Sequence, residues 1–97
     1  MRVQLVNGAQ RDFTGGLRWY RKRSDWAADG FAEEVNNAIT RILQDPARNR
    51  QIRPNVRTIR IKRYPYSLIY LIHPGTIIIV AIAHDKRRPG CWTRRLD

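Results

Sequence analysis

The clearest pattern in the chain is a stripe of apolar residues at helical spacing between Phe31 and Leu43. Apolar residues recur there every three or four positions, while polar residues, Glu33 and Glu34 among them, lie on the opposite side. The two glutamates fall in the first turn, where carboxylates suit the positive end of the helix dipole. Asp45-Pro46 then ends the pattern, which therefore predicts an amphipathic second helix.

An earlier segment predicts a first helix. Apolar residues fall on one helical face at Phe13, Leu17 and Tyr20. We expect this helix to run from Ala9 to about Ala28 and to end at the break Asp29-Gly30. Gly15-Gly16 weakens the pattern, because a glycine inside a helix costs about 1 kcal/mol relative to alanine, unless the pair allows close packing on a neighbour. Two helices joined by a short break predict an antiparallel hairpin.

Strand patterns occupy both ends of the chain. Four segments alternate or carry β-branched residues: Val3–Val6, Thr58–Lys62, Ser67–Ile72 and Thr76–Ile82. The last is almost continuously apolar, which predicts a central, covered strand. Pro74-Gly75 predicts a tight turn before it, and residues 47–55 predict a basic, polar loop.

These elements predict a single α+β domain over residues 1–97, in the order β-α-α-β-β-β. Short connections make the last three strands antiparallel, so we expect an antiparallel sheet with the helical hairpin packed on one face. The opposite face is predicted to be basic and concave. An exposed edge at Val3–Val6 or at Thr58–Lys62 would accept a strand from a partner.

Charge locates the functional surface. The chain has 19 Lys and Arg, most of them Arg, against 8 Asp and Glu, so its net charge is +11. Residues 1–45 carry a net charge of +1 and residues 46–97 a net charge of +10. Such a surface attracts polyanions, and arginine binds phosphate with two donors at once. Because so basic a protein repels its own copies, we expect the free chain to be a monomer.

The single cysteine, Cys91, excludes an internal disulfide and a cysteine-based zinc site. No pair of potential ligands has metal-binding spacing, so we expect no metal and no cofactor. No apolar run has the length of a membrane span, and the start lacks the apolar stretch of a signal peptide. We therefore expect a cytoplasmic protein with no membrane partner.

The most specific motif lies in the C-terminal third. An aromatic-Pro-Tyr step at residues 64–66 leads into the strand residues Ser67–Tyr70, whose last position is the motif's tyrosine. Residues 81–92, AIAHDKRRPGCW, follow the pattern Ala-x-x-His-x-x-Arg-x-Pro-x-x-Trp. Together with the two helices, this arrangement resembles the RelE/ParE toxin superfamily, in particular its plasmid-stabilisation branch. The resemblance covers nearly the whole chain.

The resemblance implies the toxin of a type II toxin–antitoxin pair, held in check by a cognate acidic antitoxin. RelE-like members cut mRNA on the ribosome, whereas ParE-like members inhibit DNA gyrase without known catalysis. The two branches therefore imply different partners, the ribosome with mRNA or DNA gyrase.

A metal-independent endoribonuclease must move protons and stabilise the charged phosphorane. In the RelE-like comparison, Arg60 matches a basic sheet position, and Lys86 or Arg87 matches a C-terminal arginine. His84 would supply the acid or base. Two departures weaken this comparison: Trp92 stands where RelE has a tyrosine, and Ser67 where many members have an arginine.

Further residues are candidates for contacting nucleic acid, and they are Arg57, Lys62, Arg63, Lys86, Arg88, Trp92, Arg94 and Arg95. The simpler interpretation of the sheet bases is a solvated face. For Trp92 we favour a role in pinning the tail, Asp85–Asp97, to the sheet over base stacking. Tyr70 is expected in the core with a satisfied hydroxyl. Trp19 and Trp26 are expected on one face of the first helix.

We therefore predict a toxin that inhibits growth by ribosome-associated mRNA cleavage. The alternative is a ParE-like, non-catalytic gyrase poison that acts mainly through the surfaces of the helical hairpin. A further alternative is a non-toxic, basic nucleic-acid-binding module.

Overall fold

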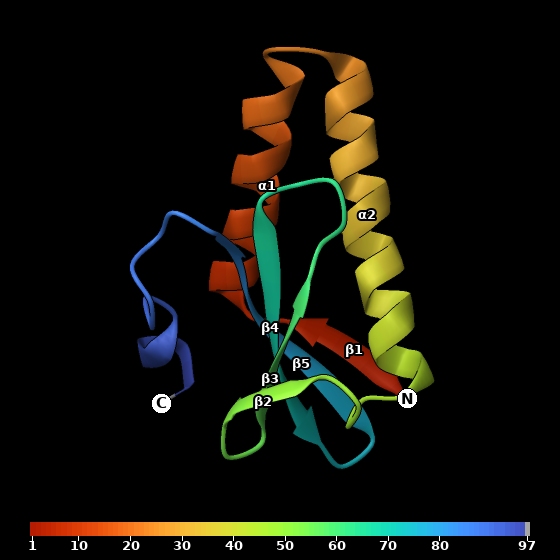
Figure 1. Ribbon diagram of the computed structural model, residues 1–97, viewed down its shortest axis with the longest axis vertical. Coiled ribbons are helices and arrows are strands. Elements are labelled where there is room, and N and C mark those ends of the chain that lie inside the picture. Colours follow the sequence, from red (N-terminus) through yellow and green to blue (C-terminus); the bar gives the residue numbers. More distant parts are fainter. Residues whose placement is uncertain (97) are drawn as a thin grey trace.

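The computed structural model describes residues 1–96, and Asp97, the last residue of the predicted tail, lies outside the described residues. The elements are β1 (Arg2–Leu5), α1 (Asn7–Arg21), α2 (Asp25–Gln44), β2 (Arg50–Arg53), β3 (Val56–Arg60), β4 (Tyr66–His73), β5 (Thr76–His84) and the short 3-10 helix η1 (Thr93–Leu96). Figure 1 shows the two helices as a hairpin that extends beyond the sheet. The predicted α+β architecture is confirmed.

The sheet has five strands in the order β1-β5-β4-β3-β2. The last three strands of the chain are antiparallel, as predicted, and β5 is an interior strand between β1 and β4. However, β1 pairs in parallel with β5, with Arg2 opposite Thr76, so the sheet is mixed and not purely antiparallel. The parallel pairing follows from the helical hairpin, which carries the chain across the sheet between β1 and the later strands.

The predicted loop at residues 47–55 contains strand β2, which pairs with β3. Its sequence, Arg-Gln-Ile-Arg, has one apolar residue and so lacks the pattern of a strand. Asn55, with φ of 63°, provides the left-handed residue of the turn to β3. Because β2 covers β3, the predicted open edge at Thr58–Lys62 is wrong, whereas β1 is an edge strand as expected.

The helices meet at residues 22–24, before the predicted break at Asp29-Gly30. Ser24 starts α2 because its side chain accepts a hydrogen bond from the Ala27 N–H at 3.3 Å. Gly30 lies inside α2, where a Cβ would collide with the Tyr64 hydroxyl. That hydroxyl donates to the Ala27 carbonyl at 2.8 Å, so this glycine serves close packing and not helix termination.

The main core lies between the hairpin and the sheet, with Phe31 fully buried at its centre. The Phe31 ring contacts the rings of Phe13 and Tyr20, with centroid distances of 5.9 and 5.3 Å. Tyr70 is fully buried, and its hydroxyl donates to the Pro46 carbonyl at 2.6 Å, which confirms its predicted role.

Glu34 departs from its predicted place on the polar side of the second helix, because only 7% of it is exposed. Its carboxylate accepts a hydrogen bond from Asn37 at 3.2 Å and lies 3.6 Å from the Arg63 guanidinium. Arg63 has φ of 70° in the β3–β4 turn, so a buried acid of α2 faces a turn with left-handed backbone.

A second, smaller apolar cluster covers part of the opposite sheet face. Its buried members are Val56, Ile69, Val80, Ala81 and Trp92. Trp92 belongs to the C-terminal tail, so the prediction that it pins the tail to the sheet is confirmed. The opposite face is therefore partly apolar and covered, and not entirely basic and open as predicted.

One carboxylate joins α1, β5 and the tail. Strand β1 pairs with β5 only as far as Ile79, which leaves the next polar groups of that edge without a partner strand. Asp12 of α1 accepts a hydrogen bond from the Ile82 N–H at 3.0 Å, and Arg95 donates to the Val80 carbonyl at 3.1 Å. Asp12 is also 2.7 Å from Arg95 and 3.2 Å from Arg87, and only 9% of its side chain is exposed.

The adjacent glycines of α1 provide a matched test of packing. A Cβ at Gly16 would lie 2.6 Å from the Phe31 ring, whereas a Cβ at Gly15 would meet nothing within 4 Å. We expect Gly16→Ala to lower the free energy of unfolding by about 1–3 kcal/mol through overpacking. Gly15→Ala should instead raise it by up to about 1 kcal/mol. Urea unfolding measures both, and equal effects would contradict the packing role of Gly16.

Removal of the Asp12 charge tests the three-way junction. Asp12→Asn leaves two cations without their carboxylate, so we expect the free energy of unfolding to fall by about 2–4 kcal/mol. Amide exchange at Ile82 should also accelerate. The control is Asp25→Asn, which removes the same charge from an exposed pair with Arg21 and should cost less than about 1 kcal/mol. Similar losses in the two variants would show that Asp12 has no special role.

Candidate functional site

The predicted C-terminal site residues surround a cavity of about 250 Å³ on the face opposite the helices. His84 and Arg87 line it, together with Arg88, Trp92 and Ser67. These side chains come from the ends of β4 and β5 and from the start of the tail. The tail curves back over the sheet because Trp92 is buried in the second apolar cluster.

His84 is held by its surroundings. Its Nδ1 accepts a hydrogen bond from the Lys86 N–H at 3.0 Å, a geometry that requires an unprotonated Nδ1. Its ring stands almost perpendicular to Tyr66, with the centroids 5.0 Å apart. Burial raises the pKa of the Tyr66 hydroxyl, which therefore stays protonated at neutral pH and does not act as a base.

The two predicted catalytic arginines form ion pairs. Arg60 lies 2.8 Å from Asp85, and Arg87 lies 3.2 Å from Asp12. Arg60 is not part of the His84 cavity, but it lines a separate depression of about 540 Å³ at the β3–β4 turn. The structure thus brings His84 and Arg87 together and places Arg60 beside them, linked through Asp85.

Several residues that were predicted to contact nucleic acid are bonded to other groups of the protein. Arg57 donates to the Asn49 carbonyl at 2.7 Å, and Arg63 faces Glu34. Arg95 donates a hydrogen bond to Asp12, and this bond holds the tail against α1. The same bond raises the pKa of Arg95. Trp92 is only 8% exposed. The remaining predicted contacts are exposed and pair with no acid among residues 1–96, and they are Lys62, Lys86, Arg88 and Arg94.

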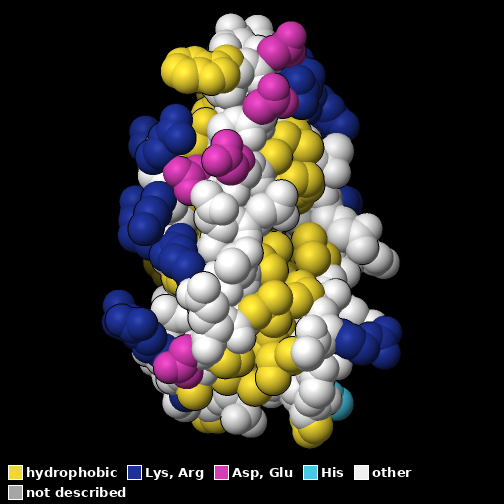
Figure 2. All heavy atoms as spheres, turned by 90° about the vertical axis from the view of Figure 1, so that its right-hand side faces the viewer, with side chains coloured by type: hydrophobic (Ala, Val, Ile, Leu, Met, Phe, Trp, Pro, Cys, Tyr) yellow, Lys and Arg dark blue, Asp and Glu magenta, His cyan; other side chains and the backbone are white. Residues whose placement is uncertain are grey.

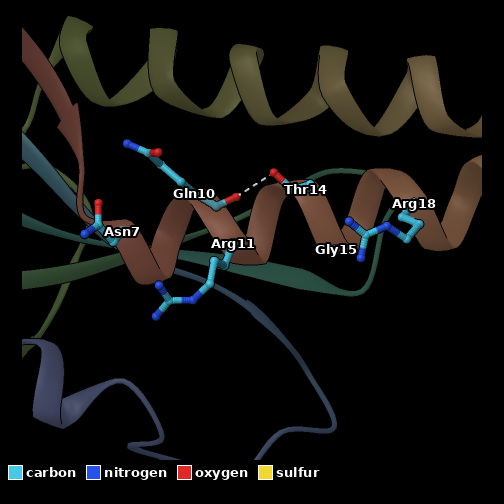
Figure 3. Close-up of a pocket in the computed structure, with 6 residues that line it drawn as sticks. All are labelled: Asn7, Gln10, Arg11, Thr14, Gly15 and Arg18. Carbon is cyan, nitrogen blue, oxygen red and sulfur yellow. Dashed lines mark hydrogen bonds between the residues drawn. The ribbon is translucent and has the colours of Figure 1, made fainter.

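The outer face of α1 carries a depression that the sequence prediction did not include. Its volume is about 510 Å³, and its lining residues, shown in Figure 3, are Asn7, Gln10, Arg11, Thr14, Gly15 and Arg18. Arg11 and Arg18 are exposed, and neither forms an ion pair within the described residues. Their seven-residue spacing, which places them two helical turns apart on one face, was the available signal.

The hairpin tip exposes two tryptophans, 53% of Trp19 and 83% of Trp26. They lie on different helices, which corrects the prediction that they share a face of the first helix. The Arg23 guanidinium lies 3.5 Å from the centre of the Trp19 ring. Figure 2 shows a hydrophobic side chain projecting at the hairpin end of the molecule, above an apolar stripe that runs down this face.

Residues 1–96 contain neither a candidate membrane span nor a cluster of metal-ligating side chains. No helix there combines the length and the apolarity needed to cross a membrane. No group of three or more His, Cys, Asp or Glu side chains could hold a metal ion in that part of the chain.

Comparisons with known proteins agree with this architecture. A chain from a solved structure titled "Chromosomal ParDE TA system from P. aeruginosa" superposes with a TM-score of 0.73. It is 18% identical in sequence, and the match covers 87% of this chain and 95% of that one, so it shows a shared fold. The search of curated proteins gave no match.

A family model supplies the decisive comparison. The model described as "ParE toxin of type II toxin-antitoxin system, parDE" matches residues 3–89. The matched range extends from β1 through β5 to the first residues of the tail, and so includes the hairpin and His84 and Arg87. The chain therefore belongs to the ParE toxin family of type II toxin–antitoxin systems.

Proposed function

We propose that this toxin inhibits growth by binding DNA gyrase, as a non-catalytic poison, and that a cognate antitoxin neutralises it. The observation that carries the proposal is the pairing of the predicted catalytic arginines, Arg60 with Asp85 and Arg87 with Asp12. It favours the gyrase alternative over the mRNA cleavage predicted from the sequence.

The ion pairs matter because phosphorane stabilisation depends on positive charge that is not already compensated. The Arg60–Asp85 pair places a carboxylate next to the cavity where the scissile phosphate would sit. Asp12 pairs with Arg87 from the helix side and is further fixed by Arg95 and the Ile82 amide. A phosphate entering the cavity would meet the Asp85 carboxylate and an Arg87 that is already paired with Asp12. Trp92 cannot supply the proton that a tyrosine would.

The hairpin tip supports a protein target. Trp26 is 83% exposed in a chain whose other aromatic side chains, Trp19 apart, are mostly buried. Large exposed aromatic residues are the commonest anchors of protein–protein interfaces. The tip projects beyond the sheet in Figure 1, so both tryptophans can reach a partner without moving the core.

The apolar stripe in Figure 2 and the net charge of +11 support the second partner, an acidic antitoxin. An apolar segment of the antitoxin would cover the stripe, while its acids would offset the excess positive charge. The family description, which names a toxin–antitoxin system, agrees with this partner.

The deciding experiment measures both activities of the purified chain. With DNA gyrase and a relaxed plasmid, we expect the toxin to inhibit the introduction of supercoils by gyrase and to cause cleaved DNA to accumulate. In a translating extract, we expect intact mRNA. His84→Ala should change neither result, because the proposal gives this residue no chemical step. Translation-dependent mRNA breaks that disappear in His84→Ala would overturn the proposal in favour of the nuclease.

A substitution at the tip tests the contact with gyrase. Trp26→Ala should raise the concentration of toxin needed to inhibit gyrase at least about tenfold, as expected for a buried interface anchor. Stability should change little, since the side chain is largely solvated. The control is Leu43→Ala, which removes a partly exposed apolar residue near the other end of α2 and should leave gyrase inhibition unchanged. An equal loss in both variants would argue against the tip.

A further inference from the structure

We infer that the outer face of α1 binds the phosphodiester backbone of duplex DNA, through Arg11 and Arg18 in the depression shown in Figure 3. This surface lies on α1, away from the His84 cavity, and the sequence motif does not include it. The choice of DNA over other polyanions rests on the proposed function, in which the toxin acts on an enzyme that holds duplex DNA.

The charges of Arg11 and Arg18 are available to a ligand. Of the bases first assigned to nucleic acid, Arg57, Arg63 and Arg95 are held by groups of the protein itself. Arg11 and Arg18 are exposed and unpaired within residues 1–96, as are Lys62, Lys86, Arg88 and Arg94. Arg11 and Arg18 share one helix face. Both can therefore bind a phosphate without first breaking an ion pair.

The side chains that line the depression are polar or positively charged, apart from Gly15. The depression is also lined by the amide and hydroxyl groups of Asn7, Gln10 and Thr14, and no carboxylate lines it. The Thr14 hydroxyl donates to the main-chain carbonyl of Gln10 at 3.0 Å, as the dashed line in Figure 3 marks. The donors left for a phosphate are therefore the guanidinium groups and the side-chain amides of Asn7 and Gln10. Arginine, amide and hydroxyl groups are the side chains that most often contact DNA phosphates.

The spacing of Arg11 and Arg18 along α1 suits a phosphate backbone. Seven residues of helix span about 10 Å, and the phosphates of one DNA strand follow one another at about 3.4 Å of rise along the duplex axis, so the two arginines can contact separate phosphates of one strand. Gly15 lies between the arginines, and nothing stands within 4 Å of the place where its Cβ would be. The missing side chain leaves the helix surface open to a backbone approaching between the two guanidinium groups. Arg21, one turn further, is paired with Asp25 at 3.3 Å and so ends the free surface.

The test uses Gly15, because substitution there does not disturb the fold. Gly15→Glu would place a carboxylate three residues from Arg18 and four from Arg11, where it pairs with both. Gly15→Gln has nearly the same shape and no charge. Binding of the full chain to a short labelled DNA duplex is followed by fluorescence anisotropy over a range of salt concentrations. We expect Gly15→Glu to weaken binding at least about tenfold and Gly15→Gln to leave it nearly unchanged.

A second pair of variants separates this surface from net charge. Replacing Arg11 and Arg18 by Gln should lower the slope of log affinity against log salt by about 2. Replacing Arg50 and Arg53 of β2 by Gln removes the same charge from exposed residues elsewhere and should change the slope less. Equal losses from the two double variants, no loss in Gly15→Glu, or a preference for single-stranded RNA over duplex DNA would each overturn the inference.

The same measurement distinguishes failure here from failure of the proposed function. Direct binding to DNA is measured without gyrase, whereas poisoning is measured as cleaved plasmid. A Gly15→Glu chain that loses neither DNA binding nor poisoning, but no longer binds an acidic antitoxin peptide, would assign the surface to the antitoxin and contradict the inference.

Discussion

The structure depends on the carboxylate of Asp12. Strand β1 is shorter than β5, so the outer edge of β5 has peptide groups that no strand covers. Asp12 accepts one of these N–H groups and at the same time fixes Arg87 and Arg95 of the tail. A single buried charge thereby replaces the missing part of β1 and holds the tail over the sheet. Without it, the first helix, the central strand and the tail would have no common polar contact.

The same contact determines what the C-terminal motif does. Arg87 looked like a residue for phosphate, yet its partner is the acid that organises the sheet edge. Trp92 is similarly occupied, since its burial with Val80 and Ala81 completes a second small core. The motif thus contributes to folding as well as to any contact with a target. Fewer of its cations are free to bind a target than their number suggests, so the exposed groups of the helices are the better candidates for that contact.

The sequence predicted the features that follow from periodicity. The second helix, the central strand β5 and the turn at Gly75 all carry strong local patterns. It did not predict β2, whose residues are polar and whose strand depends on pairing with β3. Asp29-Gly30 has the pattern of a helix end, but Gly30 lies inside α2, where the absence of a side chain makes room for Tyr64. Such a tertiary contact leaves no local signal in the sequence. The partners of the candidate site residues were equally hidden, since Asp12 lies seventy or more residues from the groups it binds.

The projecting hairpin tip separates two kinds of constraint on the chain. The core is built around Phe31 and the sheet, whereas Trp19 and Trp26 stand largely in solvent. Exposed side chains there contribute little to folding, so substitutions at the tip are nearly neutral for stability. Residues at the tip are therefore free to diverge under selection by whatever they contact, while the scaffold stays fixed. Among relatives that share this fold at low identity, the tip is where partner preference can drift without loss of the protein.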